Sequence, residues 1–325
     1  MDRLSNFRTE IMGGAILLVV FFHLTFRIYN NDLWYIPSTH GMIGVDVFFL
    51  LSGLGLSYSF TKNHSLLNYY YKRIARIFPF YGVVVFTNGV LLHGLSIQDF
   101  LLQWTTIGYW TTGSYYEWYV PNLILMYLVF PLWYYFVKHF FSISILFILL
   151  FSSYIMIQNS GLNFMAWARY PSFLIGVIIH QKLAYLQTRN IKLFAIILFV
   201  LCTINILWLH ANYSNSELIN NGWIFKPHIL ATPGFCLIIS YIALIPIVST
   251  ILKWFGRMSF EVYLLSGIFV GYALDLAVDK GWSKPLTGVV FLFMSFVVAY
   301  FFQTVNNNIY LYFNNVIKWY YEDKK

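Results

Sequence analysis

One stretch decides the fold, the run Ala15-Ile16-Leu17-Leu18-Val19-Val20-Phe21-Phe22-His23, in which a histidine follows eight apolar residues. About 20 mainly apolar residues suffice for a helix to cross the hydrocarbon core, and residues 11–29 form such a run. Ionisable groups are costly inside hydrocarbon and by default mark a pathway or a reaction centre. We therefore expect a membrane helix that carries a functional histidine.

The composition of the whole chain agrees with this expectation. Of the 325 residues, 59% are hydrophobic, 21% are aromatic and only 10% are charged, whereas about a quarter of the residues in a soluble domain are charged. The net charge of +8 comes from basic residues in short loops between apolar runs, which is typical of membrane topology. We predict an all-α polytopic membrane protein that contacts the lipid bilayer and binds no nucleic acid.

Ten apolar segments are candidates for membrane-spanning helices. They lie at residues 11–29, 41–60, 78–95, 119–137, 143–158, 164–184, 192–210, 229–252, 259–276 and 286–308. With both termini in the cytoplasm, fifteen of the 20 Lys and Arg residues fall on the cytoplasmic side and four on the outer side, as the positive-inside rule requires. We expect about ten helices in one integral-membrane domain, residues 1–325, without a soluble extension. The short segment 98–112 is expected to lie in the interface or to re-enter.

Three ionisable residues are predicted to meet in the outer half of the membrane. At 1.5 Å per residue, His23 lies about 9 Å from the outer end of its helix and Asp46 about 8 Å from the outer start of the next. Arg169 has a similar depth on the sixth predicted helix, so we expect the three to face a shared polar cavity. His23 is the candidate general base, oriented by a carboxylate such as Asp46. A structural role for His23, and a structural ion pair between Asp46 and Arg169, stay open as alternatives.

A basic stretch, Tyr71-Lys72-Arg73-Ile74-Ala75-Arg76-Ile77-Phe78-Pro79, leads into the third predicted helix. Basic flanks fix the orientation of a membrane helix, and proline suits a first helical turn. The same cations would also form a clamp for a phosphorylated cofactor, because arginine offers a rigid bidentate fork to phosphate. Spacing does not choose between these interpretations. The sequence contains no glycine-rich phosphate loop, zinc-binding cluster or GxSxG motif, and we predict no metal site.

These blocks, in this order, resemble the membrane-bound acyltransferase family 3, bacterial enzymes that O-acylate surface polysaccharides. The helix with His23 resembles the family's first helix and its catalytic histidine. The stretch Gly44-Val45-Asp46-Val47-Phe48-Phe49-Leu50-Leu51-Ser52-Gly53 is close to the family's GVDxFFxLSG signature. Four further blocks are similar to family patterns: residues 72–79 to RRxxRIxP, Trp118-Tyr119 with Tyr127 and Pro131 to the fourth-helix pattern, residues 169–176 to RxxxFxxG, and residues 256–264 to LGxxSYxxYL.

The resemblance implies an O-acyltransferase of the bacterial plasma membrane. Such an enzyme moves an acyl group, usually acetyl, from cytoplasmic acyl-CoA to a hydroxyl of a surface or exported polysaccharide or a lipid-linked glycan. The CoA phosphates are assigned to Lys72, Arg73 and Arg76, roughly 20 Å in depth from His23, given a hydrocarbon core of about 30 Å. His23 would activate the acceptor or carry the acyl group transiently, and Ser52 would donate to the oxyanion. Acceptor binding is assigned to Arg169, Glu117, Trp118 and Tyr119.

Some positions depart from the family pattern. Met12 stands where the family has an arginine, with Arg8 one turn earlier as a substitute. Leu123 and Ile124 stand where a glutamate is expected, and Ser266 holds a late histidine position. A polysaccharide exporter or flippase, with a polar cavity inside ten helices, remains an alternative, as does a catalytically degenerate relative.

Overall fold

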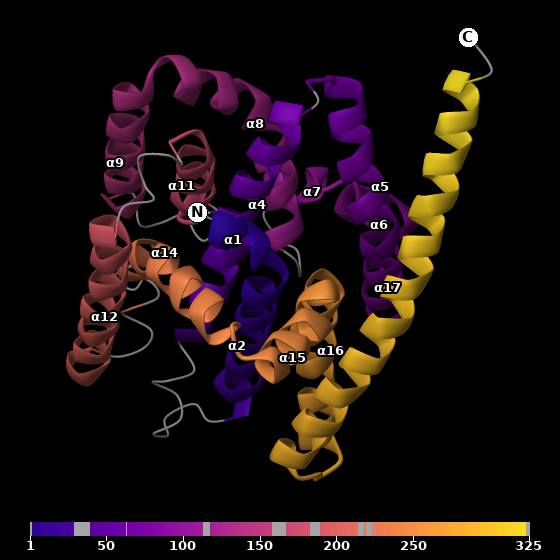
Figure 1. The fold of residues 1–325 in the computed structure, drawn as a ribbon. Coiled ribbons are helices and arrows are strands. Elements are labelled where there is room, and N and C mark those ends of the chain that lie inside the picture. Colours follow the sequence, from indigo (N-terminus) through magenta and orange to yellow (C-terminus); the bar gives the residue numbers. More distant parts are fainter. Residues whose placement is uncertain are drawn as a thin grey trace.

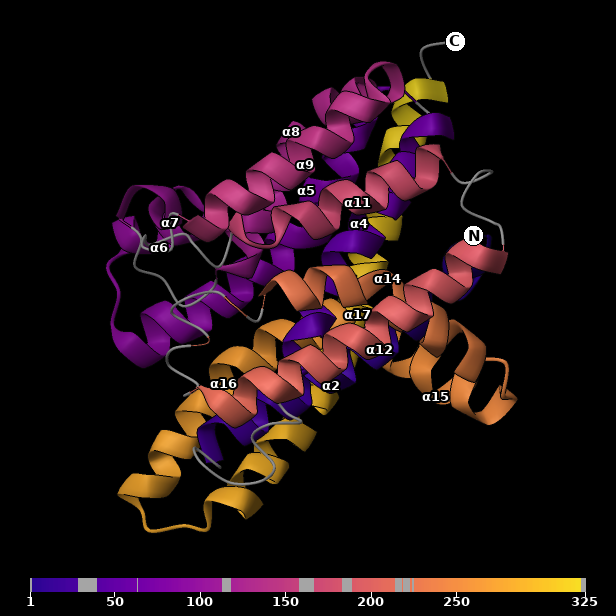
Figure 2. The same cartoon turned by 90° about the vertical axis from the view of Figure 1, so that its left-hand side faces the viewer.

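The computed structural model describes residues 2–28, 40–62, 64–112, 118–157, 167–182, 189–213, 218, 223 and 225–322. Every regular element within these ranges is helical. Most of the long helices run side by side in one tilted bundle (Figures 1 and 2). Without water to satisfy the backbone, an apolar chain crosses hydrocarbon as a helix because each helix satisfies its own hydrogen bonds. The protein is an all-α polytopic membrane protein, as predicted.

The helices follow one another along the chain with short connections. The first half contains α1 (Asp2–Asn6), α2 (Arg8–Ile28), the 3-10 turn η1 (His40–Met42), α4 (Ile43–Lys62), α5 (Leu66–Val85), the π-helical segment η2 (Phe86–Leu92), α6 (Ile97–Trp104), α7 (Ile107–Thr112) and α8 (Tyr119–His139). The second half contains α9 (Phe141–Ile157), α11 (Tyr170–Gln181), α12 (Arg189–Asn212), α14 (Phe225–Ile242), α15 (Pro246–Arg257), α16 (Ser259–Asp279) and α17 (Lys284–Glu322).

Within the described residues, eight helical stretches are long and apolar enough to cross a membrane. Two of the ten expected spans correspond to shorter helices, α9 with 17 residues and α11 with 12 described residues. The segment 98–112 forms the short helices α6 and α7. The count of ten and the cytoplasmic termini stay predictions.

The expected span 229–252 is wrong in its second half. The first helix, α14, ends at Ile242, and a new helix, α15, begins at Pro246 after a turn. Proline has no backbone N–H to continue a helix but fits a first turn well. Hydropathy alone missed the break because the residues on both sides of Pro246 are apolar.

The centre of the bundle is α4, which packs against α2, α8, α11 and α14. Its seam with α11 is closed by two glycines. A Cβ on Gly53 would collide with the backbone oxygen of Phe173, and a Cβ on Gly176 with that of Leu50. Small residues let membrane helices approach until their backbones touch. The glycines of two separate sequence blocks therefore serve one helix–helix contact.

A second glycine contact joins α15 to the first turns of α2. A Cβ on Gly13 would meet the backbone oxygen of Leu252, and a Cβ on Gly256 that of Thr9. Beside this contact, buried Glu10 forms an ion pair with the half-exposed Lys253 at 3.4 Å. Both views place α15 beside α2 (Figures 1 and 2). This helix supports the N-terminal end of α2.

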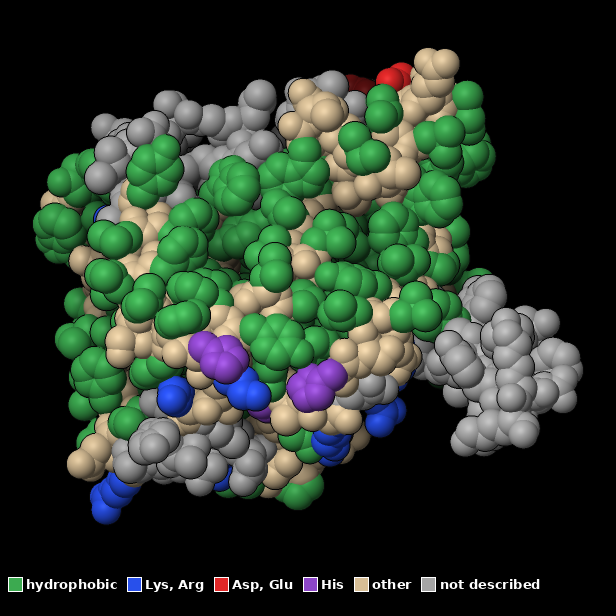
Figure 3. Space-filling model, turned by 90° about the horizontal axis from the view of Figure 1, so that it is seen from above, with side chains coloured by type: hydrophobic (Ala, Val, Ile, Leu, Met, Phe, Trp, Pro, Cys, Tyr) green, Lys and Arg blue, Asp and Glu red, His purple; other side chains and the backbone are tan. Residues whose placement is uncertain are grey.

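The outer helices of the bundle expose apolar side chains. Large hydrophobic residues are exposed along α9, α12 and α17, and α17 forms one edge of the bundle (Figure 1). Figure 3 shows hydrophobic side chains over much of one end, with cationic side chains gathered toward one border. An apolar recess of about 240 Å³ lies between α5, α16 and α17. These faces fit hydrocarbon contact, which leaves the interior of the bundle for polar groups.

Candidate functional site

His23 lies on α2 and is held from α16. Its Nδ1 lies 3.2 Å from Oγ of Ser266, whose own hydroxyl donates to the backbone oxygen of Tyr263 at 3.2 Å. Since that serine proton is already used, Ser266 accepts the Nδ1–H of His23, and Nε2 becomes the basic nitrogen. The ring of Tyr263 lies 5.9 Å from the imidazole. The structure thus orients the predicted base through a serine.

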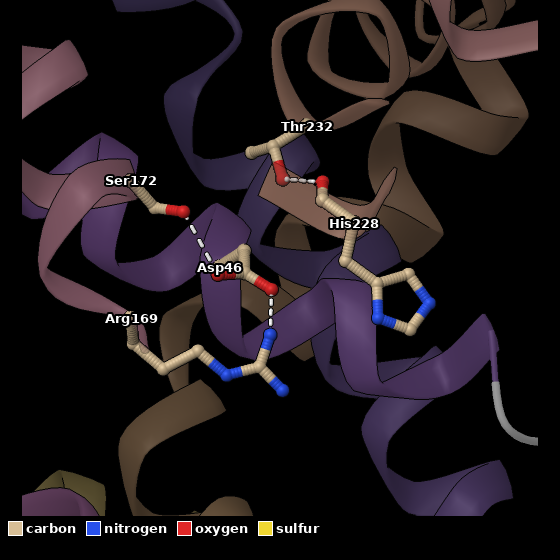
Figure 4. Close-up of polar contacts among 5 residues, drawn as sticks. All are labelled: Asp46, Arg169, Ser172, His228 and Thr232. Carbon is tan, nitrogen blue, oxygen red and sulfur yellow. Dashed lines mark hydrogen bonds and ion pairs between the residues drawn. The ribbon is translucent and has the colours of Figure 1, made fainter. Parts of the chain in front are cut away.

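Asp46 is fully buried and joins α4 to α11. One of its carboxylate oxygens pairs with Arg169, and the other accepts a hydrogen bond of 2.8 Å from the hydroxyl of Ser172 (Figure 4). Arg169 is only 1% exposed, so each charge compensates the other away from water. Asp46 and Arg169 meet, as their predicted depths suggested, whereas the shared cavity that would also include His23 stays a prediction. Both carboxylate oxygens are used by α11, which favours the structural ion pair over a role for Asp46 in orienting His23.

His228 on α14 lies beside this pair. It is 1% exposed, its backbone oxygen accepts from Thr232 at 2.8 Å (Figure 4), and its ring lies 6.3 Å from that of His40. One turn earlier on the same helix, the ring of Phe225 lies 4.6 Å from the guanidinium carbon of Arg169. A buried imidazole therefore accompanies the Asp46–Arg169 pair.

Three arginines gather near the N-terminal end of α2. Arg8 on α2 interacts electrostatically with Arg73 and Arg76 on α5 and with Tyr127 on α8. Arg73 donates to the backbone oxygen of Tyr69 at 3.3 Å and lies 4.5 Å above its ring. Like charges repel, so such a cluster is a site at which an anion is stabilised. Arg8, the residue one turn before the expected arginine position, belongs to this cluster.

Two tyrosines connect the arginine cluster to His23. Tyr119, only 5% exposed, interacts with Arg8 and Arg76 and lies 4.5 Å, ring to ring, from Tyr263. Tyr263 in turn contacts His23. Along α2 itself, Arg8 and His23 are 15 positions apart, which corresponds to about 22 Å of helix. The cluster and the base therefore stand at two levels of one continuous contact network.

The remaining predicted residues have varied surroundings. Tyr119 packs inside the bundle against Phe48 and Phe49, so it is part of the core and not an outer surface for sugars. Trp118 stands edge-on to Tyr119. Ser52 and Lys72 are half-buried, which leaves their roles as predictions. Glu117 lies outside the described residues.

A set of aromatic rings lies near the N-terminus of α11. The rings of Trp167 and Tyr170 are stacked, with their centroids 5.2 Å apart, and the ring centroid of Trp167 lies 5.6 Å from that of Trp110 on α7. Tyr109 contacts Trp110 at 5.0 Å, and burial raises the pKa of the Tyr109 hydroxyl to about 12. That hydroxyl keeps its proton near neutral pH and remains a hydrogen-bond donor.

Comparison with known proteins identifies the family. The acyltransferase domain (Acyl_transf_3) matches residues 13–304. The chain belongs to this acyltransferase family. It is also similar to the acyltransferase MdmB of Streptomyces mycarofaciens, with 32% identity over 30% of this chain and 29% of that relative. The chain thus matches less than a third of the relative's length. No solved structure matches the chain. The resemblance noted in the sequence is confirmed at the level of the family.

Three features of the candidate site could not be found from the sequence. Ser266, which in the sequence is only a departure from the family pattern, lies against His23. Glu261, which is 6% exposed, interacts with Arg76. Its place inside the block of residues 256–264, which resembles a family pattern, was the available signal. His228 had no signal, because a histidine among apolar residues looks the same whether or not it adjoins an ion pair.

Proposed function

We propose that this acyltransferase moves an acyl group, in the usual case acetyl, from cytoplasmic acyl-CoA to a hydroxyl of a cell-surface or exported polysaccharide. The observation that carries the proposal is the position of His23, with Nδ1 fixed by Ser266 and the arginine cluster connected to it through Tyr119 and Tyr263. The arginine cluster lies at one level of the helix bundle and the candidate general base His23 at another. This separation suits a donor with a long arm between its phosphates and its thioester.

The donor binds through its phosphates. Arg73 and Arg76, joined by Arg8, are the groups that we assign to the CoA phosphates because guanidinium groups bind phosphate through bidentate hydrogen bonds. Lys72 adds positive charge to the same helix. The pantetheine arm would follow Tyr119 and Tyr263 toward His23 and bring the thioester to the imidazole.

The chemical step needs one base. Nε2 of His23 takes the proton of the acceptor hydroxyl while its oxygen attacks the thioester carbonyl. The carbon–sulfur bond then breaks, and the imidazolium returns the proton to the CoA thiolate, so the reaction releases no net proton. Transient transfer of the acyl group to His23 would balance equally and remains an alternative route. Ser52 is a candidate donor to the oxyanion.

Acyl-CoA turnover by the purified protein tests this proposal. Wild type and His23→Ala would be placed in nanodiscs with acetyl-CoA, and free CoA would be measured with and without glycan from bacterial envelopes. Loss of a general base costs about 10²–10⁴ in rate, so His23→Ala should release almost no CoA while retaining the wild-type melting temperature. Retained turnover in a folded His23→Ala variant would contradict the proposal.

We place the protein in a bacterial plasma membrane for the same reason. An enzyme that takes its donor from the cytoplasm and serves glycans of the cell surface must contact both sides of that membrane. Labelling of single introduced cysteines from each side of intact cells would test whether Arg73 and His23 lie on opposite halves.

A further inference from the structure

The short helix α15 (Pro246–Arg257) connects two helices that are each long and apolar enough to cross a membrane, α14 and α16. Three residues separate α15 from Ile242, where α14 ends, and one residue separates it from Ser259, where α16 begins. Such short connections keep α15 close to the ends of both spans. Its 12 residues extend about 18 Å, less than a hydrocarbon core of about 30 Å. The helix therefore lies at a boundary of the membrane.

One face of α15 packs against the first turns of α2. A Cβ on Gly13 would meet the backbone oxygen of Leu252, and a Cβ on Gly256 would meet that of Thr9. Figure 2 shows α15 protruding from the bundle at an angle to the long helices. The helix thus lies at the end of the bundle at which α2 begins, and its remaining surface is turned away from the protein.

A second face of α15 is apolar and exposed. Ile247, Ile251 and Trp254 are 69%, 49% and 45% exposed, and spacings of four and three residues place them in one stripe along the helix. The turn before the helix exposes two more apolar residues, Leu244 and Ile245. Tryptophan is enriched where hydrocarbon meets the headgroups of a bilayer. This face suits contact with acyl chains.

A third face of α15 is polar and basic. Thr250, Lys253 and Arg257 are exposed, and spacings of three and four residues again form one stripe. At about 100° per residue, this stripe lies beside the apolar one, and both point away from Leu252 and Gly256. The helix contains no acidic residue, so its exposed charge is positive.

The two exposed faces require a partner that is apolar on one side and anionic on the other. Lys253 is 50% exposed and neutralises the buried Glu10 at 3.4 Å. Arg257 forms no ion pair within the part of the chain that the structure describes, which leaves its charge for an external anion. A phospholipid with an anionic headgroup offers both surfaces, and helices with this division of side chains bind such lipids.

We propose that α15 is an interfacial helix that binds anionic phospholipid. Ile247, Ile251 and Trp254 enter the acyl-chain region, and Arg257, with Lys253 beside it, binds the headgroup phosphate. The helix then anchors the first turns of α2 at the membrane surface. This inference does not depend on the proposed function, because it concerns a surface that the reaction does not use.

The depth of two neighbouring positions tests the orientation of α15. The native cysteines are both buried, and the full chain with Cys202→Ala and Cys236→Ala would receive either Ile251→Cys or Thr250→Cys. Each variant would be spin-labelled in nanodiscs of phosphatidylcholine and phosphatidylglycerol. The label at position 251 should be more accessible to oxygen than to a water-soluble nickel complex, and the label at position 250 should show the reverse.

Two results of this measurement would reject the inference. If both labels are more accessible to the nickel complex, α15 stands in water. If both labels are shielded from oxygen and from nickel, a protein covers this face, either a second copy of the chain or another partner.

Lipid retention tests the basic face. Native mass spectrometry of the full chain, released from the same nanodiscs, measures the ratio of bound phosphatidylglycerol to bound phosphatidylcholine. Arg257→Gln should lower this ratio about fivefold, the effect of one cation at an anionic surface. Arg257→Lys keeps the charge and should retain most of the binding. Lys253 is kept in all variants, because its removal would leave Glu10 buried without a cation.

Lys280→Gln is the matched control. It removes one exposed positive charge at the opposite end of α16, and the lipid ratio should stay at the wild-type value. An unchanged ratio in Arg257→Gln would reject anionic lipid as the partner. Equal losses in Arg257→Gln and Lys280→Gln would also reject it, since they indicate a general effect of net charge. A loss in Arg257→Lys as large as that in Arg257→Gln, with a lower melting temperature for both, would assign Arg257 to the fold instead.

Discussion

The arginines at the two levels of the bundle have opposite surroundings. Near the N-terminal end of α2, Arg8, Arg73 and Arg76 lie close to one another, and Arg76 is exposed. Near the N-terminus of α11, Arg169 is 1% exposed and is paired with Asp46. The first arrangement brings three positive charges together with a single acidic neighbour described, Glu261, and its excess of positive charge suits an anionic ligand. The second cancels its charge inside the fold, which suits a fixed architecture. One residue type thus forms a cluster of like charges at one level, to which we assign donor binding, and a buried ion pair at the other.

Removing the carboxylate of the Asp46–Arg169 pair is the most severe test of this contrast. Asp46→Ala leaves Arg169 buried without its counter-ion, which should lower stability by about 3–5 kcal/mol. The double variant Asp46→Leu/Arg169→Met replaces the pair by apolar side chains and should recover most of the loss. Thermal unfolding in detergent measures both effects. An unchanged melting temperature for Asp46→Ala would mean that the pair is not structural.

The clustered arginines should behave in the opposite way. Arg73→Gln/Arg76→Gln removes charge-assisted hydrogen bonds to phosphate, each contributing about 1.5–3 kcal/mol, so the KM for acetyl-CoA should rise about tenfold or more. The melting temperature and the requirement for acceptor should hardly change. The single variant Lys72→Gln should have a smaller effect. A similar increase in the acceptor requirement would show that these residues only anchor the helix in the membrane.

Two glycines two residues apart on α4 sharpen the comparison. Gly53→Ala forces its methyl group into the backbone of α11 and should cost about 1–3 kcal/mol, as overpacking does. On Gly55 the nearest atom to a Cβ is Nε of Arg8, at 3.2 Å. Gly55→Ala should therefore leave stability nearly unchanged and raise the KM for acetyl-CoA by displacing Arg8. Equal destabilisation by both would remove the distinction between a structural seam and a binding cluster.

The smallest effect is expected between the two levels, at Ser266. Ser266→Ala removes the acceptor for Nδ1 of His23, and a lost hydrogen bond of about 1 kcal/mol corresponds to roughly a fivefold lower kcat. The KM for acetyl-CoA should stay the same. In the background of His23→Ala, Ser266→Ala should have no further effect, since neighbouring residues that act together are not additive. Additive losses would separate Ser266 from the base.

The membrane class, the family, and the meeting of Asp46 with Arg169 could be predicted from the sequence. Apolar length and the placement of basic residues depend on the bilayer alone, and the depth of a residue follows from counting along its helix. The direction in which each side chain points around its helix axis could not be predicted in this way. The contact of His23 with Ser266, the position of His228, and the break before Pro246 depend on how helices rotate and pack against one another.

The glycine seam between α4 and α11 has a mechanical consequence. Where backbones touch directly, no side chain can change rotamer to accommodate sliding, so the two helices behave as a single stiff strut. Any movement that admits the proposed acceptor or releases the proposed CoA product must then occur at other contacts, such as those of α16 with α17. During a catalytic cycle, the other helices would move around a fixed α4–α11 pair. His23 lies on α2, which packs against α4.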